Sequence, residues 1–222
     1  MNTDNVTCTR KRSRRRPASI GRAFTLVELL VVISIIAVVA GLVVGLTRTA
    51  SERKKVTRAQ AELNRLVTLI ENYRARLGVL PPDNPDKNSP HLNTLFYELA
   101  SAVRMNPNSG NPTYTTRLRV DVRSNVLYET FGVSGLINAR DANADITELK
   151  PILKDVRPDQ TNSIVPGTIS LTVPMEGPFG KDRPNPWQYR VGENALHNKE
   201  SFDLWVDIII GKKTNTIGNW KD

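Results

Sequence analysis

Apolar residues dominate the chain between positions 29 and 46, where 18 consecutive residues carry no charge. At about 1.5 Å per residue, a helix of this length measures about 27 Å, close to the ~30 Å hydrocarbon thickness of a bilayer. A secretory signal peptide has a shorter apolar core followed by small residues, whereas this run ends at Thr47 and Arg48. The pattern therefore predicts a transmembrane helix over residues 24–47.

Beyond this run the apolar positions change to alternating spacings of three and four residues, and charged residues fill the other positions. The positions that form this seam are Val56, Ala59, Leu63, Leu66, Ile70, Tyr73 and Leu77. Gly78 follows as a C-cap, and Pro81 prevents continuation of the helix. We expect one long helix whose outer half, residues 48–78, packs on a domain of the same chain rather than forming a coiled coil.

Residues 79–222 show short periodic segments separated by turn residues, which is typical of a small α+β domain. A second helix is expected after the proline-rich turn, with one apolar face formed by Leu92, Leu95, Phe96, Leu99 and Val103. Strands are expected over residues 187–191, 202–210 and 168–173, and Leu118, Val120 and Val122 alternate in the same way. The predicted fold class is α+β, with the long N-terminal helix packed on a small antiparallel sheet.

Individual side chains in this domain are expected to be structural. Asp145 is placed to cap a short helix over residues 146–156, which Pro151 interrupts. The alternating aromatic residues are expected in the core, and the histidines, which lack nearby metal-ligating partners, are expected to be surface or capping residues. These aromatic residues are Trp187, Tyr189 and Trp205, and the histidines are His91 and His197.

The charge of the chain is concentrated at its N-terminus. Residues 1–23 hold seven Lys or Arg and one acid, Asp4, and so account for most of the formal net charge of +9. A basic block beside an apolar run favours a topogenic signal over a nucleic-acid arm, with the N-terminus cytoplasmic and residues from about 48 outside. We therefore expect no nucleic-acid partner. The single cysteine, Cys8, lies in this block, so the rest of the chain forms no intrachain disulfide.

The basic block and the apolar run together resemble the N-terminal signature of type IV pilins and type II secretion pseudopilins, through "AFTLVELLVVISIIAVVAGL". The resemblance implies that prepilin peptidase, a membrane aspartyl peptidase, cuts between Ala23 and Phe24 and methylates the new Phe24 amine. Residues 1–23 would then be a leader that is removed. The family usually has glycine before the cut, where this sequence has Ala23.

A carboxylate lies near the start of the predicted membrane segment 24–47. It belongs to Glu28, the fifth residue counted from Phe24. A charged side chain in hydrocarbon costs roughly 2.5–3.5 kcal/mol on insertion scales. The resemblance implies a role in filament assembly, in which Glu28 pairs with the N-terminal amine of a neighbouring subunit. The alternative is a carboxylate that snorkels to the interface or is protonated there.

The C-terminal part resembles the major pseudopilin of type II secretion, through residues 182–191 and 201–220. The calcium-binding loop of that family departs from its pattern here, since Ile209-Ile210-Gly211 replaces A-D-G and Asn215-Thr216 replaces an acidic pair. Calcium commonly takes six to eight oxygen ligands, so Asp207 alone is a weak candidate. We expect no cofactor and a lost calcium loop, held by packing of Ile208, Ile210 and Ile217. Residues from about 106 to 173 have no counterpart in the compact family and resemble an insertion.

The sequence thus predicts a structural subunit of a type II secretion pseudopilus rather than an enzyme, since no catalytic constellation is present. Its expected partners are prepilin peptidase, other copies of itself, minor pseudopilins, the inner-membrane secretion platform and membrane lipid. The expected location is the bacterial inner membrane, crossed once, with residues 79–222 in the periplasm. A type IV pilin or minor pilin is one alternative, and a membrane-tethered binding module or enzyme is another.

Overall fold

The computed structural model describes residues 24–220, without the side chains of residues 42–50. The predicted leader, residues 1–23, lies outside the described residues, and so does Ala23. The chain divides into two units between Arg48 and Thr49, and the second unit holds the folded domain.

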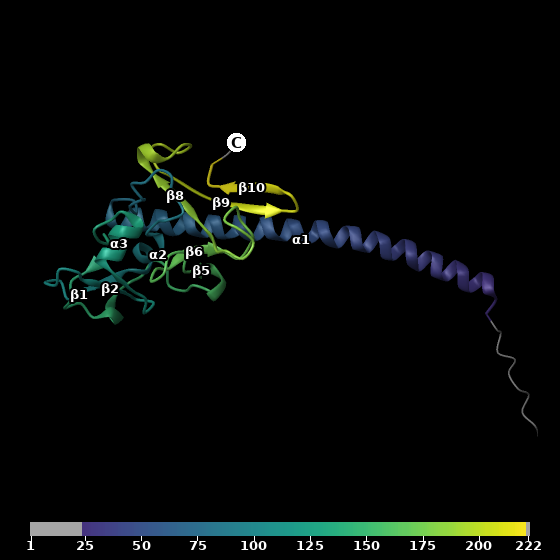
Figure 1. Ribbon diagram of the computed structural model, residues 1–222, viewed down its shortest axis with the longest axis horizontal. Coiled ribbons are helices and arrows are strands. Elements are labelled where there is room, and N and C mark those ends of the chain that lie inside the picture. The colour runs from purple at the N-terminus through teal and green to yellow at the C-terminus, as the bar shows by residue number, and fades with distance from the viewer. Residues whose placement is uncertain (1–23, 221–222) are drawn as a thin grey trace, which may run out of the picture. The chain divides into compact units, whose positions relative to one another are not determined.

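The long helix predicted from the two apolar patterns is α1, Leu26–Leu77 (Figure 1). It ends as predicted, because Gly78 adopts a left-handed conformation with φ of 76° and donates its N–H to the Arg74 carbonyl at 2.8 Å. Val56 is exposed, because the domain covers α1 only from Ala59 onward. The predicted seam is otherwise confirmed: Leu77 is partly buried, and the buried positions are Ala59, Leu63, Leu66, Ile70 and Tyr73.

The strands form three small sheets rather than the single sheet expected. The first has the order β3 (Asp121–Arg123), β2 (Thr113–Thr116), β1 (Ala102–Met105) and β4 (Ala139–Arg140), antiparallel except for the β1–β4 pair. The second is an antiparallel sheet of β10 (Lys213–Gly218), β9 (Phe202–Ile210) and β8 (Gln188–Val191). The third, also antiparallel, contains β5 (Thr161–Asn162), β6 (Ser170–Val173) and β7 (Asn185–Pro186). The α+β, pilin-like class with an N-terminal helix on small antiparallel sheets is confirmed.

Short helices complete the domain. Two of them are shorter than the helices predicted from the sequence. The second helix, α2, is only Leu95–Ala100 and is buried on all sides, and Val103 lies in strand β1. The expected helix over residues 146–156 is a single 3₁₀ turn, η1, Ile146–Glu148. Asp145 caps it as predicted, accepting the Thr147 N–H at 2.7 Å. The chain then turns inward before Pro151, so that Ile152 and Leu153 donate N–H groups to the Leu99 carbonyl. The remaining short helices are α3 (Ser124–Phe131), η2 (Pro158–Gln160) and η3 (Gly192–Asn194).

The alternation along β9 explains which aromatic residues reach the core. Trp187 and Tyr189 are buried as predicted, whereas Trp205 is only partly buried, so its assignment to the core was wrong. Successive strand residues face opposite sides, and in β9 the inward positions are the even-numbered ones, from 202 to 208. Trp205 lies on the other face, where its ring centroid is 5.9 Å from that of Trp220.

The 106–173 segment is part of the core rather than an appendage. It supplies buried side chains and also binds α1 directly, because Gln160 Nε2 donates to Glu62 Oε2 at 2.6 Å and Arg65 donates to the Asp155 carbonyl at 2.7 Å. Its buried apolar residues include Val122, Leu127, Phe131, Leu153 and Leu171. Of the alternating residues 118–122, only Val122 lies in a strand, because the chain turns at residues 117–120. That the segment is an insertion stays a prediction.

A buried carboxylate links three parts of this domain. Glu98 of α2 is fully buried and accepts hydrogen bonds from the Tyr73 hydroxyl at 2.8 Å and from the N–H groups of Ile137 and Asn138 at 2.8 and 2.9 Å. Burial raises the pKa of Glu98, and the three hydrogen bonds oppose this shift. Burial, followed by the charge of Glu98, also raises the pKa of Tyr73. Glu98 thereby fixes α1 and the 137–138 loop to α2.

Candidate assembly and membrane segment

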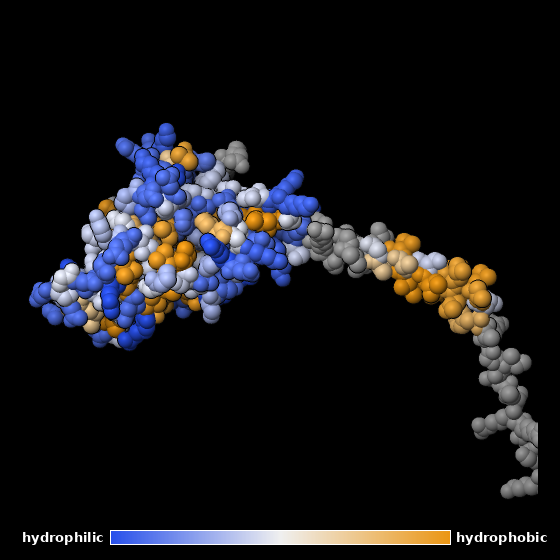
Figure 2. Space-filling model, in the orientation of Figure 1, coloured by the Kyte–Doolittle hydropathy of each residue, from blue (hydrophilic) through white to orange (hydrophobic). Residues whose placement is uncertain are grey.

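The segment of residues 24–41 has apolar residues at nearly every position, and these side chains are exposed; they form the orange part of the helix in Figure 2. Phe24 is 75% exposed and Leu26 78%, and Val38, twelve residues further along, is still 65% exposed. A helix that is apolar all round is normally buried against another protein or in lipid. This segment therefore carries the largest uncovered apolar surface among the described residues. No helix found within the described residues is sufficiently long and apolar to cross a membrane.

The start of α1 is organised by a reciprocal pair of residues. The Glu28 N–H donates to Thr25 Oγ1 at 3.2 Å, and Glu28 Oε2 accepts from the Thr25 N–H and hydroxyl, both at 3.4 Å. The Leu29 N–H donates to the Thr25 carbonyl at 3.1 Å, so the first helical bond begins there. This is a capping box, in which an N-cap hydroxyl and a carboxylate three residues later satisfy free N–H groups. Thr25 was missed as a site residue, although its T-x-x-E spacing before an apolar run is the sequence signature of such a cap.

Most polar groups of residues 24–41 are hydrogen-bonded inside the segment. Besides Thr25 and Glu28, the only polar side chain is Ser34, whose hydroxyl donates to the Leu30 carbonyl at 2.8 Å. Glu28 Oε1 accepts no hydrogen bond from any described residue. The segment therefore offers a neighbour apolar surface and a single carboxylate oxygen.

Residues 21–44 match the family model of the prokaryotic N-terminal methylation motif. This motif is the prepilin signal of type IV pilin-like proteins, and it implies processing by prepilin peptidase and assembly into pilus-like polymers. It also implies an N-terminal segment anchored in a bacterial membrane. Proteins with this motif are structural rather than enzymatic. Comparison with curated proteins and with solved structures found no match.

The matched range includes Ala23, Phe24 and Glu28, and it gives no cleavage position. Phe24 precedes the helix and is exposed. Cleavage between Ala23 and Phe24, methylation of Phe24 and the assembly role of Glu28 stay predictions.

The region of the expected calcium loop is held by internal contacts. Asp207 accepts a hydrogen bond from Gln188 Nε2 at 2.8 Å and one from the Thr216 hydroxyl at 2.6 Å. Ile208 and Ile217 are buried, as the packing prediction requires, and Ile210 is partly buried. Within the described part of the chain, no group of three or more His, Cys, Asp or Glu residues lies close enough to hold a metal ion. Loss of the calcium loop stays a prediction.

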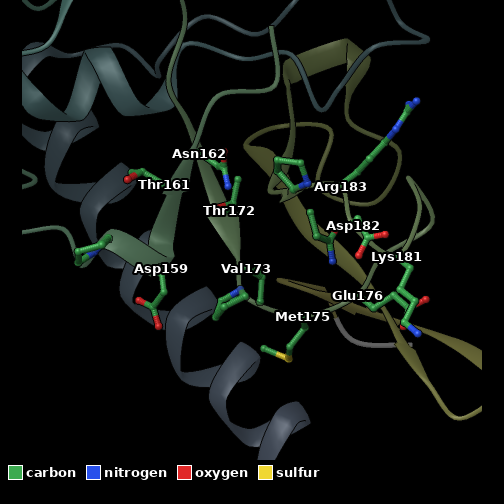
Figure 3. A pocket seen from close by; sticks show the side chains of 14 residues that line it. Asp159, Thr161, Asn162, Thr172, Val173, Met175, Glu176, Lys181, Asp182 and Arg183 are labelled. Carbon is green, nitrogen blue, oxygen red and sulfur yellow. The ribbon is translucent and has the colours of Figure 1, made fainter. Parts of the chain in front are cut away.

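A cavity of about 390 Å³ lies beside β6 and β7 (Figure 3). Its charged side chains do not converge, because Asp159 lies on the opposite side of the cavity from Glu176 and Asp182. Its lining residues include no serine, cysteine or histidine to serve as a nucleophile and base. The two histidines instead stack on aromatic rings, His91 on Phe179 at 5.1 Å and His197 on Trp220 at 3.9 Å.

Proposed function

We propose that this chain is a structural subunit of a type II secretion pseudopilus. Prepilin peptidase cuts between Ala23 and Phe24 and methylates Phe24, and the subunit then polymerises through its N-terminal helix to drive protein export. Its partners are other copies of itself, minor pseudopilins, the inner-membrane secretion platform and membrane lipid. Residues 24–47 cross the inner membrane once, and residues 79–222 form the periplasmic domain.

The exposed apolar surface of residues 24–41 is the observation that carries this proposal. Burial of apolar area is worth about 25 cal/mol per Å², so a helix with every apolar side chain uncovered gains strongly from lipid or from packing against other helices. The prepilin motif covers the same residues. Lipid would hold the subunit before assembly, and the helices of neighbouring subunits would replace lipid in the filament.

Glu28 supplies the polar part of that assembly. Its Oε2 is used by the Thr25 cap, whereas its Oε1 is open to a donor from outside the chain. The methylated amine of Phe24 on a neighbouring subunit is a cation, and it would neutralise the carboxylate with a charge-assisted hydrogen bond. An isolated subunit bears the cost of an unpaired carboxylate in hydrocarbon, and assembly removes that cost.

The C-terminal segments support a pseudopilin over the alternative of a type IV pilin or minor pilin. Asp203 accepts three consecutive backbone N–H groups, from Leu196, His197 and Asn198, at 2.6–2.9 Å. Asn219 holds both neighbours of Asp203, accepting the Leu204 N–H and donating to the Phe202 carbonyl, each at 2.9 Å. Residues 202–204 (F-D-L) and 217–220 (I-x-N-W) belong to the segment that resembles the pseudopilin sequence. Their hydrogen bonds hold the end of the chain against β9.

The capping box allows a sharp test of the assembly role. Glu28→Gln keeps a capping side chain, since glutamine also serves at this position, but removes the charge. Thr25→Ala removes the cap and keeps the charge. We expect Glu28→Gln to be processed and to accumulate in the membrane but to lose filament formation and export, whereas Thr25→Ala retains most of both. Intact mass, membrane content and export of the system's substrate are measured for each variant.

Normal filaments and export by a processed Glu28→Gln protein would limit Glu28 to helix capping and contradict the assembly role. The neighbouring genes distinguish a type II secretion pseudopilus from a type IV pilus. Genes for a secretion ATPase, a platform protein and a secretin beside this one would favour the pseudopilus. A membrane-tethered binding module or enzyme would leave no filament in cells that contain the whole machinery.

A further inference from the structure

Two cavities at the end of α1 share three lining residues, and we treat them together as one groove. The larger has a volume of about 650 Å³ and the smaller about 350 Å³, and they share Arg76, Leu149 and Lys150. Arg76 comes from the last turn of α1, and the other two follow η1. Cavities of this size hold a peptide segment or a small ligand. We call this feature the basic groove.

The side chains around the basic groove are strongly cationic. Its charged lining residues are Arg76, Arg117, Arg140, Lys150 and Lys154, and no lining residue is acidic. Arg76 donates to the Lys150 carbonyl at 2.6 Å, and the four others have no ion pair with any described residue. Clustered charges of one sign in a concave site focus the field on a ligand of opposite charge.

Asp145, a carboxylate near the groove, has its pKa lowered by a hydrogen bond and in part by neighbouring arginines. The Thr147 N–H, followed by the charges of Arg119 and Arg117, lowers the pKa of Asp145 below its ordinary value. Asp145 caps η1 and does not line either cavity, so it leaves the groove open to an external anion.

The lining of the groove also includes apolar residues. Leu118, Leu149 and Pro151 line the larger cavity together with the cations, and Leu77, Ile137 and Ala139 line the smaller one. A phosphate or a sulfated sugar would leave this apolar surface uncovered. A ligand that fits both features carries negative charges and an apolar group.

The turn beside the groove keeps arginine at a strained position. Arg119 has φ of 62°, a left-handed conformation that Gly and Asn adopt more readily. The turn is closed by the Thr116 N–H to the Val120 carbonyl at 2.9 Å, so its conformation is fixed by the hairpin. Strained residues cluster at binding sites, and Arg119 directly follows Arg117 and Leu118, which line the larger cavity.

We propose that the basic groove binds an acidic peptide segment that carries an apolar side chain between its carboxylates. Arginine and lysine side chains would hold the carboxylates, and Leu118 and Leu149 would cover the apolar side chain. The proposal goes beyond filament assembly and depends only on the folded domain.

The test uses the full chain in nanodiscs of zwitterionic lipid and a fluorescent peptide of alternating glutamate and leucine as the probe. A glutamate-only peptide, a glutamine–leucine peptide of the same length and a heparin fragment serve as comparisons. The groove variant is Lys150→Gln with Lys154→Gln, and the charge-matched control is Lys199→Gln with Lys212→Gln, at exposed lysines outside the groove. Fluorescence polarisation gives the affinity.

We expect the glutamate–leucine peptide to bind more tightly than the three comparison ligands. The groove variant should lower its affinity roughly fivefold, and the control pair less than about twofold, since single exposed charges contribute little. Equal losses in the two variants would overturn the proposal, because they would show a general charge effect. Equal or tighter binding of any comparison ligand would also overturn it, as charge alone, apolar contact alone or a polysaccharide would then account for binding.

Discussion

The two ends of α1 use apolar residues in opposite ways. Residues 24–41 are apolar on every face and are exposed, whereas residues 59–77 are apolar along one seam that is buried by the domain. A one-sided seam is satisfied by the chain's own fold. An apolar surface on every face cannot be covered by a single small domain, so its partner lies outside the chain. The distribution of apolar residues around one helix thus separates folding from assembly.

Two matched leucines, one in the buried seam and one in the exposed segment, give the strongest test of this difference. Leu66→Ala removes a fully buried seam residue and should lower the free energy of unfolding of the domain by about 2–5 kcal/mol. Leu30→Ala lies in the exposed apolar segment and should change domain stability by less than about 0.5 kcal/mol. Denaturant unfolding followed by tryptophan fluorescence measures both. Equal destabilisation by the two variants would show that the N-terminal segment is part of the domain fold.

A smaller effect is expected at the buried carboxylate that fixes α1 to the domain. Glu98→Gln replaces one accepting oxygen by an amide N–H₂, so the N–H of Ile137 or Asn138 loses its partner. A buried unsatisfied donor costs about 1–3 kcal/mol, and the domain should be destabilised by that amount. Glu98 lies in α2 and outside the apolar segment of residues 24–41, so membrane content should not change.

The stability difference between the native protein and Glu98→Gln depends on pH, because the pKa of Glu98 is raised in the folded state. A carboxyl whose pKa is higher in the folded state binds more protons there, so it contributes most stability below the ordinary glutamate pKa. That contribution declines as pH rises through the raised pKa. The stability advantage of the native protein over Glu98→Gln should therefore shrink from acid toward neutral pH in urea titrations. An advantage that grows with pH would contradict the buried, hydrogen-bonded carboxyl.

The smallest effect sharpens the comparison by separating stability from binding within the domain. Arg119→Gly relieves the left-handed conformation but adds freedom to the unfolded chain, for a net gain of roughly 0.5 kcal/mol in stability. The melting temperature should rise slightly while affinity for the glutamate–leucine peptide falls. A lower melting temperature would indicate a structural contact of the Arg119 side chain.

Periodicity predicted the elements that have a single buried face. The seam of α1 and strand β9 follow directly from spacings of three and four, and of two, residues. Helix α2 was misjudged because all six of its residues are buried, so no polar face marked where it ends before Val103. Strand β1 begins at Ala102, so its apolar residues follow those of α2 almost directly in the sequence.

The site was predictable in part for a similar reason. Local signals such as the register of Phe24 and Glu28, or the Thr25 cap, depend on neighbouring residues and can be found in the sequence. The basic groove could not be found in this way, because its cations come from residues 76, 117, 140, 150 and 154. Only the fold brings them together.

The most direct test of the account is the intact mass of the protein extracted from membranes of cells that contain prepilin peptidase. The account predicts the mass of residues 24–222 with one added methyl group, because the exposed apolar helix functions as a mature N-terminus that starts at Phe24. Glu28→Gln should be cut at the same position and should give the mass calculated for its own residues 24–222 with one added methyl group. Retention of residues 1–23, or a cut at another position such as after Gly21, would contradict the claim that this segment is a prepilin-type assembly helix.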